Sequence, residues 1–288
     1  MVSANITALL ATYIDALHVL HHHGVLDGYG HLSVRNPDNP PTFFMMRQVA
    51  PALVSGLNDI GEYRVADAEP VHSDTPAAPI ERFIHSELLK RYSDVNVVLH
   101  GHPDELIAYS IAPAARLKPV LHMAPFLGKH LPCLVATPVL ITRRYTGSTV
   151  PIFDIAAHYS PSDTQDFLVR NQRLGAALAA EFGDGSPPYP PHNLVLMASH
   201  GFAAVARDVK LATYMGVYAV ANARVQSQAL QLQQIAAMGG ARDHVVYLDE
   251  RQIKDSWETE TRLVEKPWGL WVREVRVDPL YVNELSQE

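Results

Sequence analysis

The chain has 288 residues, of which 48% are hydrophobic and 18% charged, and its formal net charge is -7. Its 23 Lys and Arg residues are scattered, so they form no basic stripe that could bind the phosphates of a nucleic acid. No apolar run approaches the ~20 residues of a membrane span. We therefore expect a globular protein with a well-buried core, without a nucleic-acid partner and without a membrane segment.

The first third of the chain predicts two helices separated by short strands. Residues 4–23 carry apolar side chains at helical spacing. A glycine-rich loop then leads into a strand within 26–35, and the apolar residues 42–46 predict a second strand. Residues 60–71 are expected to form a hairpin, and residues 80–92 a helix.

The rest of the chain continues this alternation of strands and helices. Short apolar runs bounded by Gly or Pro predict strands, and longer stretches with helical periodicity predict helices. The expected elements are, in order, strand 96–101, helix 103–110, strand 133–141, helix 165–182, strand 193–198 and helix 209–238. The last helix is long enough to pack between subunits as well as within one.

Two features of the sequence concern the location of the protein. The first residues lack the basic region of a secretory signal. The single cysteine, Cys133, cannot form an internal disulfide, which is typical of a reducing compartment. We therefore expect a cytoplasmic protein, and any metal site in it must use nitrogen and oxygen ligands.

The run VVLHGH, which ends at His102, is the most informative motif. Because alternate residues of a strand point to the same side, His100 and His102 can bind one metal ion together. Glu81, nineteen positions before His100, is expected in the first turn of its helix, and His200 stands in the motif ASHG. Three imidazoles and a carboxylate suit a catalytic divalent metal that keeps one position open for substrate.

These motifs, together with GHLSVR at 30–35, resemble the class II aldolase/adducin family. The resemblance implies an α/β fold, a three-layer α/β/α domain around a central, largely antiparallel sheet. It also implies a homotetramer with active sites between neighbouring subunits. The implied ligands of a divalent metal ion, zinc or manganese or else iron, are His100, His102 and His200. Glu81 would be a catalytic residue beside them.

The resemblance covers residues 5 to 235 and so divides the chain in two. Residues 1–238 would form the family domain. Residues 239–288 form an aromatic-rich tail, with Trp268 and Trp271, that is expected to pack on the domain or on a neighbouring subunit. An aromatic lid would suit a ring-shaped substrate, and plain core packing is the alternative.

Several positions depart from the sugar-phosphate aldolases of this family. Those enzymes hold a substrate phosphate with a Gly-Asn pair, a Thr-Gly turn and a Ser-Ser pair before the glutamate. The same positions here read Gly-His at 30–31, Arg-Gln at 47–48 and Pro-Ile at 79–80, and Met123 replaces the tyrosine that is their usual proton donor. We therefore expect a small carboxylate substrate without a phosphate, and a different proton donor.

Arg47 stands in the region where a substrate phosphate would otherwise bind. Its guanidinium is suited to hold a planar carboxylate through two parallel hydrogen bonds. A solvated surface charge is the alternative. The Gly-His pair, combined with the Arg and the following Ala-Pro, resembles the branch of the family that includes decarboxylases of hydroxylated aromatic or pyridine dicarboxylates.

Four residues are candidates for proton transfer or substrate binding. His31 is the candidate proton donor, because imidazole titrates near neutral pH; the alternative is a loop histidine that caps backbone groups. Glu81 could act as general base or general acid beside the metal. Ser33 is a further substrate-binding candidate, and Tyr109 is a weaker one.

The leading hypothesis is a metal-dependent carbon-carbon lyase that acts on a small unphosphorylated hydroxy- or keto-carboxylate, with decarboxylation as the reaction. The alternatives are aldol or retro-aldol chemistry on an unphosphorylated carbonyl substrate, and an oxygen-consuming non-haem iron enzyme with the same ligands. A scaffold subunit without metal is the non-enzymatic alternative. Released carbon dioxide, released aldehyde and consumed oxygen distinguish the three enzymes.

Overall fold

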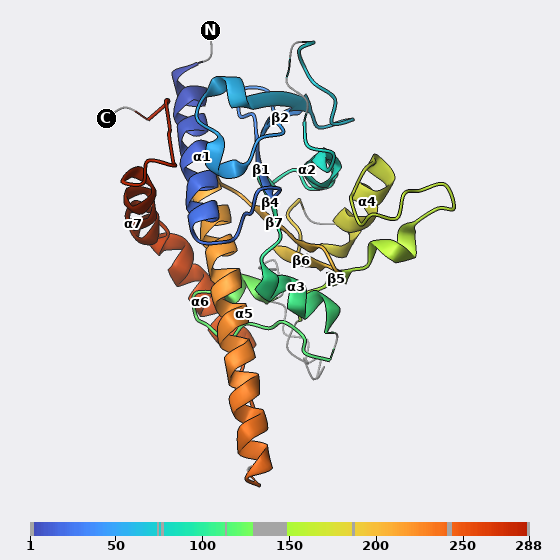
Figure 1. The fold of residues 1–288 in the computed structure, drawn as a ribbon, viewed down its shortest axis with the longest axis vertical. Helices are drawn as coiled ribbons and strands as arrows, with labels where there is room; N and C mark the ends of the chain where they lie inside the picture. Colours follow the sequence, from blue (N-terminus) through green and yellow to red (C-terminus); the bar gives the residue numbers. More distant parts are fainter. Residues whose placement is uncertain are drawn as a thin grey trace, which may run out of the picture.

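The computed structural model describes residues 3–73, 75, 78–112, 114–128, 149–185, 188–240 and 244–286. Within these ranges the chain forms one central sheet with helices on both of its faces (Figure 1). The strand expected at 133–141, together with Cys133, lies outside the described residues. In the described ranges, no helix combines the length and the apolar character that a membrane crossing needs.

The sheet of the described residues has seven strands in the order β3-β2-β1-β4-β7-β6-β5. Neighbouring strands run antiparallel, except β5 and β6, which are parallel. The strands are β1 (His31–Arg35), β2 (Thr42–Met46), β3 (Ile60–Arg64), β4 (Val97–Gly101), β5 (Ile152–Phe153), β6 (Leu194–Met197) and β7 (Gly201–Ala206). The largely antiparallel central sheet predicted from the family resemblance is thus confirmed.

The α-helices of the described residues form the two outer layers. Helices α1, α5 and α7 pack on one face of the sheet, and α2 and α4 pack on the other (Figure 1). The helices are α1 (Ala4–His22), α2 (Arg82–Arg91), α3 (Asp104–Ile111), α4 (Gln172–Glu181), α5 (Val209–Met238), α6 (Glu250–Leu263) and α7 (Glu265–Arg276). The three-layer α/β/α architecture is therefore also confirmed.

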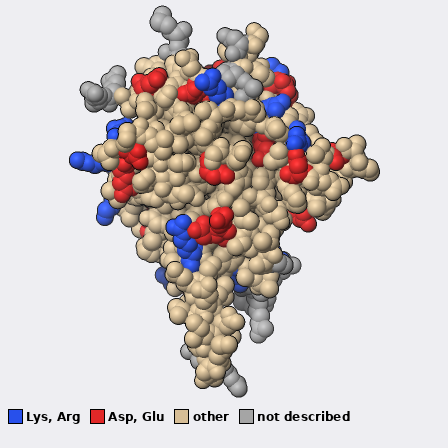
Figure 2. All heavy atoms as spheres, in the orientation of Figure 1, with Lys and Arg blue, Asp and Glu red and all other residues tan. Residues whose placement is uncertain are grey.

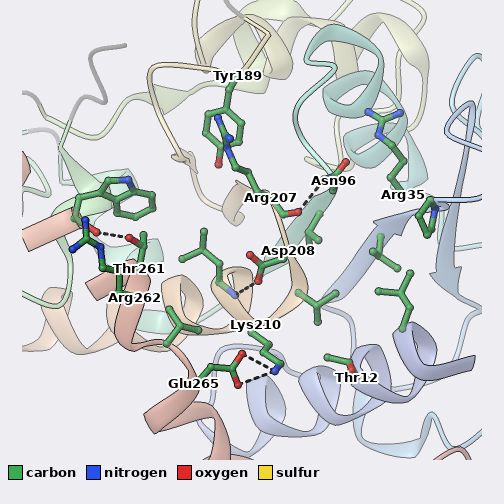
Figure 3. Close-up of a pocket in the computed structure, with 18 residues that line it drawn as sticks. Thr12, Arg35, Asn96, Tyr189, Arg207, Asp208, Lys210, Thr261, Arg262 and Glu265 are labelled. Atoms are coloured by element: carbon green, nitrogen blue, oxygen red, sulfur yellow. Dashed lines mark hydrogen bonds and ion pairs between the residues drawn. The ribbon is translucent and has the colours of Figure 1, made fainter. Parts of the chain in front are cut away.

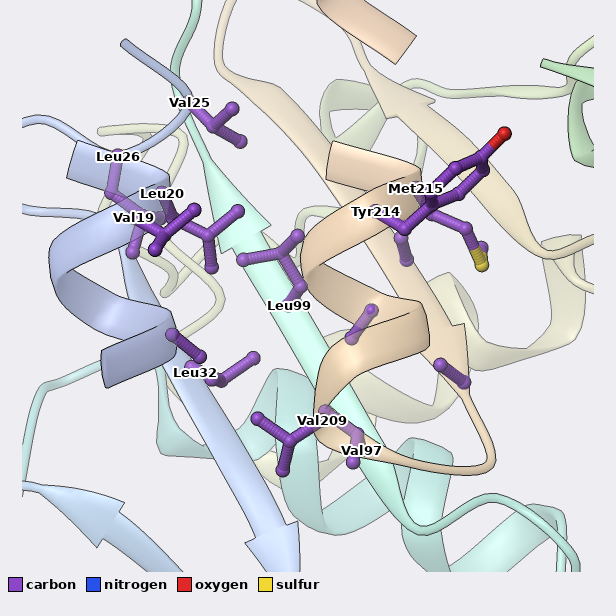
Figure 4. Packing of buried hydrophobic residues seen from close by; sticks show 14 of the residues in the cluster. Val19, Leu20, Val25, Leu26, Leu32, Val97, Leu99, Val209, Tyr214 and Met215 are labelled. Carbon is purple, nitrogen blue, oxygen red and sulfur yellow. The ribbon is translucent and has the colours of Figure 1, made fainter. Parts of the chain in front are cut away.

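Alternating side chains of the central strand β4 separate two hydrophobic cores. Val97 and Leu99 point between α1 and α5 and belong to the larger core (Figure 4). Val98 points to the opposite face, into the core that helices α2 and α4 cover. Because side chains of a strand alternate with a period of two, His100 lies on the same face as Val98, next to α2.

The long helix α5 has the bounds that the helical periodicity of residues 209–238 predicts, and both of its ends are capped. The Asp208 carboxylate accepts a hydrogen bond from the N–H of Leu211 at 2.8 Å, and Gly239 follows the last helical residue. The helix extends well beyond the body of the molecule, where its surface carries few charges (Figures 1 and 2). Leu232 and Met238 near this end are 67% and 84% exposed.

Several predicted elements differ from the structure. The helix predicted at 165–182 begins only after Asn171, whose side chain caps it. The hairpin predicted at 60–71 contains one regular strand, and the chain returns only as an isolated bridge at Pro70. Strand β7 is not among the predicted strands and separates His200 from α5. Its sequence, GFAAVA, is rich in alanine, which has a low strand propensity.

The aromatic tail folds into the helices α6 and α7, and α7 packs against its own chain. Trp268, Trp271 and Val275 of α7 are buried in the larger core, together with residues of α1 and α5. Core packing, the alternative considered for these aromatic residues, is thus what the structure contains. Contact of the tail with a neighbouring subunit, and a domain boundary at residue 238, stay predictions.

Gly101 ends β4 where two backbone segments approach closely. A Cβ at this position would collide with the carbonyl oxygen of Val25 and press on the side chain of Leu26. We expect Gly101→Ala to lower the free energy of unfolding by about 1–3 kcal/mol, as overpacking usually does. The measurement is chemical denaturation.

Gly269 in α7 provides the matched control for this substitution. A Cβ there would meet no atom within 4 Å. Gly269→Ala should therefore be neutral or slightly stabilising, because alanine is the better helix former. Equal stability of the two variants would contradict the close approach at Gly101.

Candidate metal centre and active site

Four side chains converge at one edge of the sheet. Glu81, His100, His102 and His200 each offer one ligand atom, and these atoms all lie within 4.8 Å of one another. The Nε2 atoms of His100 and His102 are 2.9 Å apart. The Oε2 atom of Glu81 lies 3.5 Å from Nε2 of His100 and 3.4 Å from Nε2 of His200. The structure thus brings together the four residues that the sequence proposes as a metal centre.

Glu81 and His200 reach this site from two different turns. Glu81 stands at the N-cap position of α2, one residue earlier than the predicted first turn, and its Oε1 accepts a hydrogen bond from the N–H of Val169 at 2.9 Å. His200 follows Ser199 in the turn between β6 and β7. Ser199 has a φ of +58°, a left-handed conformation that is uncommon for a residue with a side chain. This turn directs the imidazole of His200 towards Glu81.

The hydrogen bonds behind His100 and His102 decide which nitrogen each imidazole presents. Nδ1 of His100 donates to the carbonyl oxygen of Phe202 at 2.8 Å, and Nδ1 of His102 donates to a carboxylate oxygen of Asp27 at 3.0 Å. A neutral imidazole with its proton on Nδ1 has a lone pair on Nε2. Two such lone pairs therefore face each other across 2.9 Å. A cation between the rings would stabilise this arrangement.

A divalent metal fits this set better than a proton. Burial, and then the neighbouring His100, lower the pKa of His102 to about 4, so the imidazolium is disfavoured near neutral pH. Ligand atoms that share a metal at about 2.1 Å lie about 3.0–3.4 Å apart at ordinary coordination angles. The separations of 2.9, 3.4 and 3.5 Å between three pairs of these atoms are close to that range. Outer hydrogen bonds of this kind also orient imidazoles that bind metals.

Glu81 supplies the negative charge of the site. Burial by itself would raise the pKa of this carboxyl group, but the imidazoles of His100 and His200 beside it outweigh burial and hold its pKa well below the ordinary value. The residue is 6% exposed. The site therefore contains a buried carboxylate whose charge a bound cation would balance.

His31 lies beside the four-residue cluster and is held by a buried network. It pairs with His100 across strands β1 and β4, and the two imidazole rings are 4.9 Å apart. A hydrogen bond of 2.7 Å joins Nδ1 of His31 to Nε2 of His85, and another of 2.7 Å joins Nδ1 of His85 to the hydroxyl of Ser33. Only Nε2 of His31 is thus left to act on a ligand, and its role as proton donor stays a prediction.

The same network holds Ser33. This residue is fully buried, and its hydroxyl bonds to His85, while its role in substrate binding stays a prediction. His85 is not among the residues predicted from the sequence. A signal for it existed, because His85 follows Glu81 by four residues and so lies on the same face of α2.

Both imidazoles of the network are neutral near neutral pH. Burial, followed by the neighbouring imidazoles of His85 and His100, holds the pKa of His31 well below its ordinary value. Burial also lowers the pKa of His85 to about 3. The network therefore places polar but uncharged groups next to the cluster.

Arg47 follows β2 at the same edge of the sheet. The β1–β2 pairing ends with Ser33 and Met45, so Arg47, two residues after Met45, lies just past the paired part of β2, at the end of the sheet where β1 begins with His31. Its Nη2 donates to Oδ1 of Asp59 at 2.7 Å, while 43% of its side chain remains exposed. Arg47 is thus neither buried nor freely solvated, and a carboxylate ligand stays a prediction for it.

Tyr109, the weaker candidate, lies elsewhere. It belongs to α3, and its hydroxyl is 3.1 Å from that of Ser227 in α5. Its side chain is buried in the larger core. This tyrosine therefore connects two helices instead of facing the metal cluster.

A cavity of about 800 Å³ lies at the opposite ends of the central strands (Figure 3). Its lining includes Arg35, the last residue of β1, and Val97, the first residue of β4, whereas His31 and His100 stand at the other ends of these strands. Lys210 in its wall pairs with Glu265 at 2.8 Å. This cavity is thus separate from the candidate metal centre.

Comparison with known proteins identifies the family. Residues 11–227 match the model of the Class II Aldolase and Adducin N-terminal domain, so the chain belongs to this family. It is 41% identical over 274 residues to the decarboxylase tropJ of Talaromyces stipitatus, which covers 94% of this chain and 96% of the relative. It is 27% identical over 258 residues to the 3,4-dihydroxyphthalate decarboxylase of Arthrobacter keyseri, with 85% and 87% covered. The predicted relation to the decarboxylase-like branch is confirmed.

Solved structures share the fold. An aldolase II superfamily protein from Pseudomonas syringae has a TM-score of 0.66 at 17% identity, and the match covers 97% of this chain and 96% of that one. The L-fuculose 1-phosphate aldolase of Glaciozyma antarctica has a TM-score of 0.63 at 14% identity, with 97% and 94% covered. At these identities the likeness shows the fold alone, which is the class II aldolase fold predicted from the sequence.

Removal of one imidazole tests the metal centre directly. We expect His102→Ala to lose stoichiometric metal while keeping its fold, because one of three nitrogen ligands is then missing. His122→Ala is the control, since the side chain of His122 is 68% exposed and lies outside the cluster. Metal analysis by mass spectrometry and far-UV circular dichroism are the measurements. Wild-type metal content in His102→Ala would rule out this ligand assignment.

The buried network makes stability depend on pH. His85 is neutral in the folded chain, with a pKa of about 3, and takes up a proton near pH 6.5 once unfolded. The stability from this residue is therefore present above pH 6.5 and is lost as the pH falls towards 3, by at most about 1.4 kcal/mol per pH unit. His85→Gln should reduce the dependence of unfolding free energy on pH between 6.5 and 5 by up to this slope.

Leu88→Ala is the control for this experiment. Leu88 is fully buried on the same helix, so its truncation lowers stability without removing a titrating group. It should keep the slope of the wild type in denaturant titrations at each pH. If His85→Gln also kept that slope, His85 would not be held neutral by the fold.

Proposed function

We propose that this protein is a metal-dependent decarboxylase, a carbon-carbon lyase that acts on a small unphosphorylated hydroxy-aromatic or keto carboxylate. The observation that carries the proposal is the convergence of three imidazoles and Glu81, with His31 beside them. The names of the two decarboxylase relatives support the reaction, and the first of them matches nearly the whole chain. Family membership supports the broader class of lyase.

The reaction requires that an electron pair be accommodated on carbon. When the bond to the carboxylate breaks, carbon dioxide leaves and its bonding electrons stay with the substrate, which then takes up one proton. A divalent metal bound by His100, His102 and His200 would supply a Lewis acid that stabilises the charge on an adjacent substrate oxygen. Zinc or manganese is the proposed ion, and iron also suits this donor set.

The remaining residues would orient the substrate and deliver the proton. Arg47 is proposed to hold a substrate carboxylate, supported by its position at the end of the sheet where β1 begins with His31 and by its partial exposure. His31 is proposed to pass a proton, supplied by water, to the carbon from Nε2, the nitrogen that His85 leaves available. Glu81 is proposed as the general base or acid of the site.

A polar but phosphate-free substrate agrees with the first glycine loop. The side chain of His31 is 2% exposed and bonded to His85, so this position forms part of a buried network instead of a phosphate cradle. We further propose a homotetramer, supported by the exposed apolar end of α5, where Leu232 and Met238 stand out from the body. A cytoplasmic location is proposed from the single cysteine of the sequence.

The proposal predicts carbon dioxide release from aromatic acids with a hydroxyl group ortho to the carboxylate. The panel should contain salicylate, 2,3-dihydroxybenzoate and 3,4-dihydroxyphthalate, with carbon dioxide, aldehydes and dissolved oxygen measured in parallel. We expect stoichiometric carbon dioxide from at least one acid without oxygen uptake. Chelator treatment should stop the release, and added zinc or manganese should restore it.

Other outcomes select the alternatives. Release of an aldehyde without carbon dioxide would replace decarboxylation by retro-aldol cleavage. Oxygen consumption that accompanies turnover would indicate a non-haem iron enzyme. Purified wild-type protein without stoichiometric metal would leave only the scaffold subunit.

A further inference from the structure

The loop that carries Arg47 has little structure of its own. Residues 47–59, which we call the Arg47 loop, join β2 to β3 and contain only two single-turn 3-10 helices, Pro51–Leu53 and Leu57–Asp59. Two of its apolar side chains, Leu53 and Leu57, are 56% and 41% exposed. Val54, by contrast, is fully buried in the larger core, and its carbonyl oxygen accepts a 2.9 Å hydrogen bond from Nε2 of His18 in α1. The segment that follows it, up to Asp59, depends on further contacts to keep one conformation.

The Asp59 carboxylate links Arg47 to the backbone of the loop. One of its carboxylate oxygens accepts the 2.7 Å bond from Arg47, and the other accepts bonds from the backbone N–H of Ser55 at 2.9 Å and of Gly56 at 3.4 Å. Burial would raise the pKa of Asp59, but these hydrogen bonds outweigh it and keep the group charged. The guanidinium therefore follows the position of residues 55 and 56.

The C-terminal residues hold these same two positions. The backbone N–H of Glu284 donates to the carbonyl oxygen of Ser55 at 2.9 Å. The carboxylate of Glu284 lies so close to Gly56 that a Cβ at this position would collide with it. We call residues 281–285 the C-terminal strap.

The strap is itself fixed to helix α1. Asn283 Nδ2 donates to the carbonyl oxygen of Ala11 at 2.9 Å and to Asp15 at 2.8 Å. Asp15 also accepts a 3.0 Å bond from Arg276 at the end of α7, and its side chain is only 7% exposed. The Tyr281 hydroxyl lies 2.9 Å from Nδ1 of His21. Helix α1 is buried along its length, so it gives the strap a rigid base.

We propose that the C-terminal strap is a positioning element of the active site. It ties residues 55 and 56 of the Arg47 loop to α1, in addition to the bond between His18 and Val54, so that Arg47 is presented to the substrate carboxylate in one orientation. The path runs from Asp15 through Asn283 and Glu284 to Ser55, and from Asp59 to Arg47. This inference rests on the proposed function of Arg47, but the physical link from strap to loop does not.

The location of the strap explains why a distant segment should affect substrate binding more than the chemical step. The proposed metal ligands come from β4, the β6–β7 turn and the N-terminus of α2. Among the described residues, none of these elements is hydrogen-bonded to residues 281–285. Loss of the strap should therefore leave the metal centre intact. What changes is the freedom of Arg47, which then has to be ordered when a carboxylate binds.

Two single substitutions release the strap at different points. Asn283→Ala removes both bonds to α1, and Glu284→Pro removes the N–H that holds Ser55, because proline has none. Val282→Ala is the control, since this side chain is 52% exposed and lies within the strap. Hydrogen exchange of the amides in residues 47–59 should increase in both test variants and stay at the wild-type level in the control.

The kinetic experiment separates positioning from general stability. In both test variants we expect KM for an ortho-hydroxy aromatic acid to rise about tenfold, with kcat changed less than about twofold and metal content unchanged. When Arg47→Ala is combined with Glu284→Pro, KM should not rise beyond the value of Arg47→Ala alone, because both changes remove the same interaction. Wild-type hydrogen exchange in the test variants would overturn the proposal, and so would independent, additive effects on KM.

Failure of the proposed function is a different result. If the wild type releases no carbon dioxide from any acid, the dissociation constant of phthalate, measured by calorimetry, takes the place of KM in the same cycle. The strap proposal would still be supported if the test substitutions weaken phthalate binding in the wild-type background but not in the Arg47→Ala background. Phthalate binding that does not depend on Arg47 would overturn it.

Discussion

Two imidazole nitrogens with their lone pairs directed at one another define the site. The Nε2 atoms of His100 and His102 lie 2.9 Å apart, and a backbone carbonyl and the Asp27 carboxylate occupy the opposite ring nitrogens. Such an arrangement is unfavourable without positive charge between the rings. The buried carboxylate of Glu81 adds the anionic partner that a cation requires. The other residues of the candidate site surround these two nitrogens and hold them in place.

The parts of the fold that the sequence predicts well are those set by side-chain periodicity. The alternation along 96–101 predicts both a buried strand and the common direction of His100 and His102, because these depend only on strand geometry. Helix α5 has the predicted bounds, 209–238, because its apolar residues keep helical spacing throughout. Strand β7 escapes prediction because its alanines lack a local preference and pair only through long-range contacts.

The candidate site is predictable only in part for a similar reason. The four cluster residues are found because their chemistry and order are distinctive. The supporting residues His85 and Asp59 are harder to find. The spacing from Glu81 places His85 on the right face of its helix, but nothing in a single sequence says that it will meet His31, or that Asp59 will meet Arg47 across a loop. These contacts are consequences of tertiary packing.

The network around His31 shows how a different residue at one position can change the surroundings of the site while the fold stays the same. Where a Gly-Asn pair would suit a phosphate, the imidazole of His31 is directed inwards and joined to His85 and Ser33. Each of these groups is uncharged near neutral pH, so the region next to the cluster tolerates burial without counterions. A smaller, phosphate-free substrate is compatible with such surroundings.

The close approach of Gly101 and Gly201 affects how the proposed metal ligands could accommodate ions of different radius. A Cβ at Gly201 would collide with the carbonyl oxygen of Gly101, and His102 and His200 are the immediate neighbours of these two glycines in the chain. The two segments thus meet through their backbones, so the fold itself sets the spacing of the two histidines. At the proposed metal site, selection among divalent ions would then depend on how well an ion's radius suits this preformed spacing.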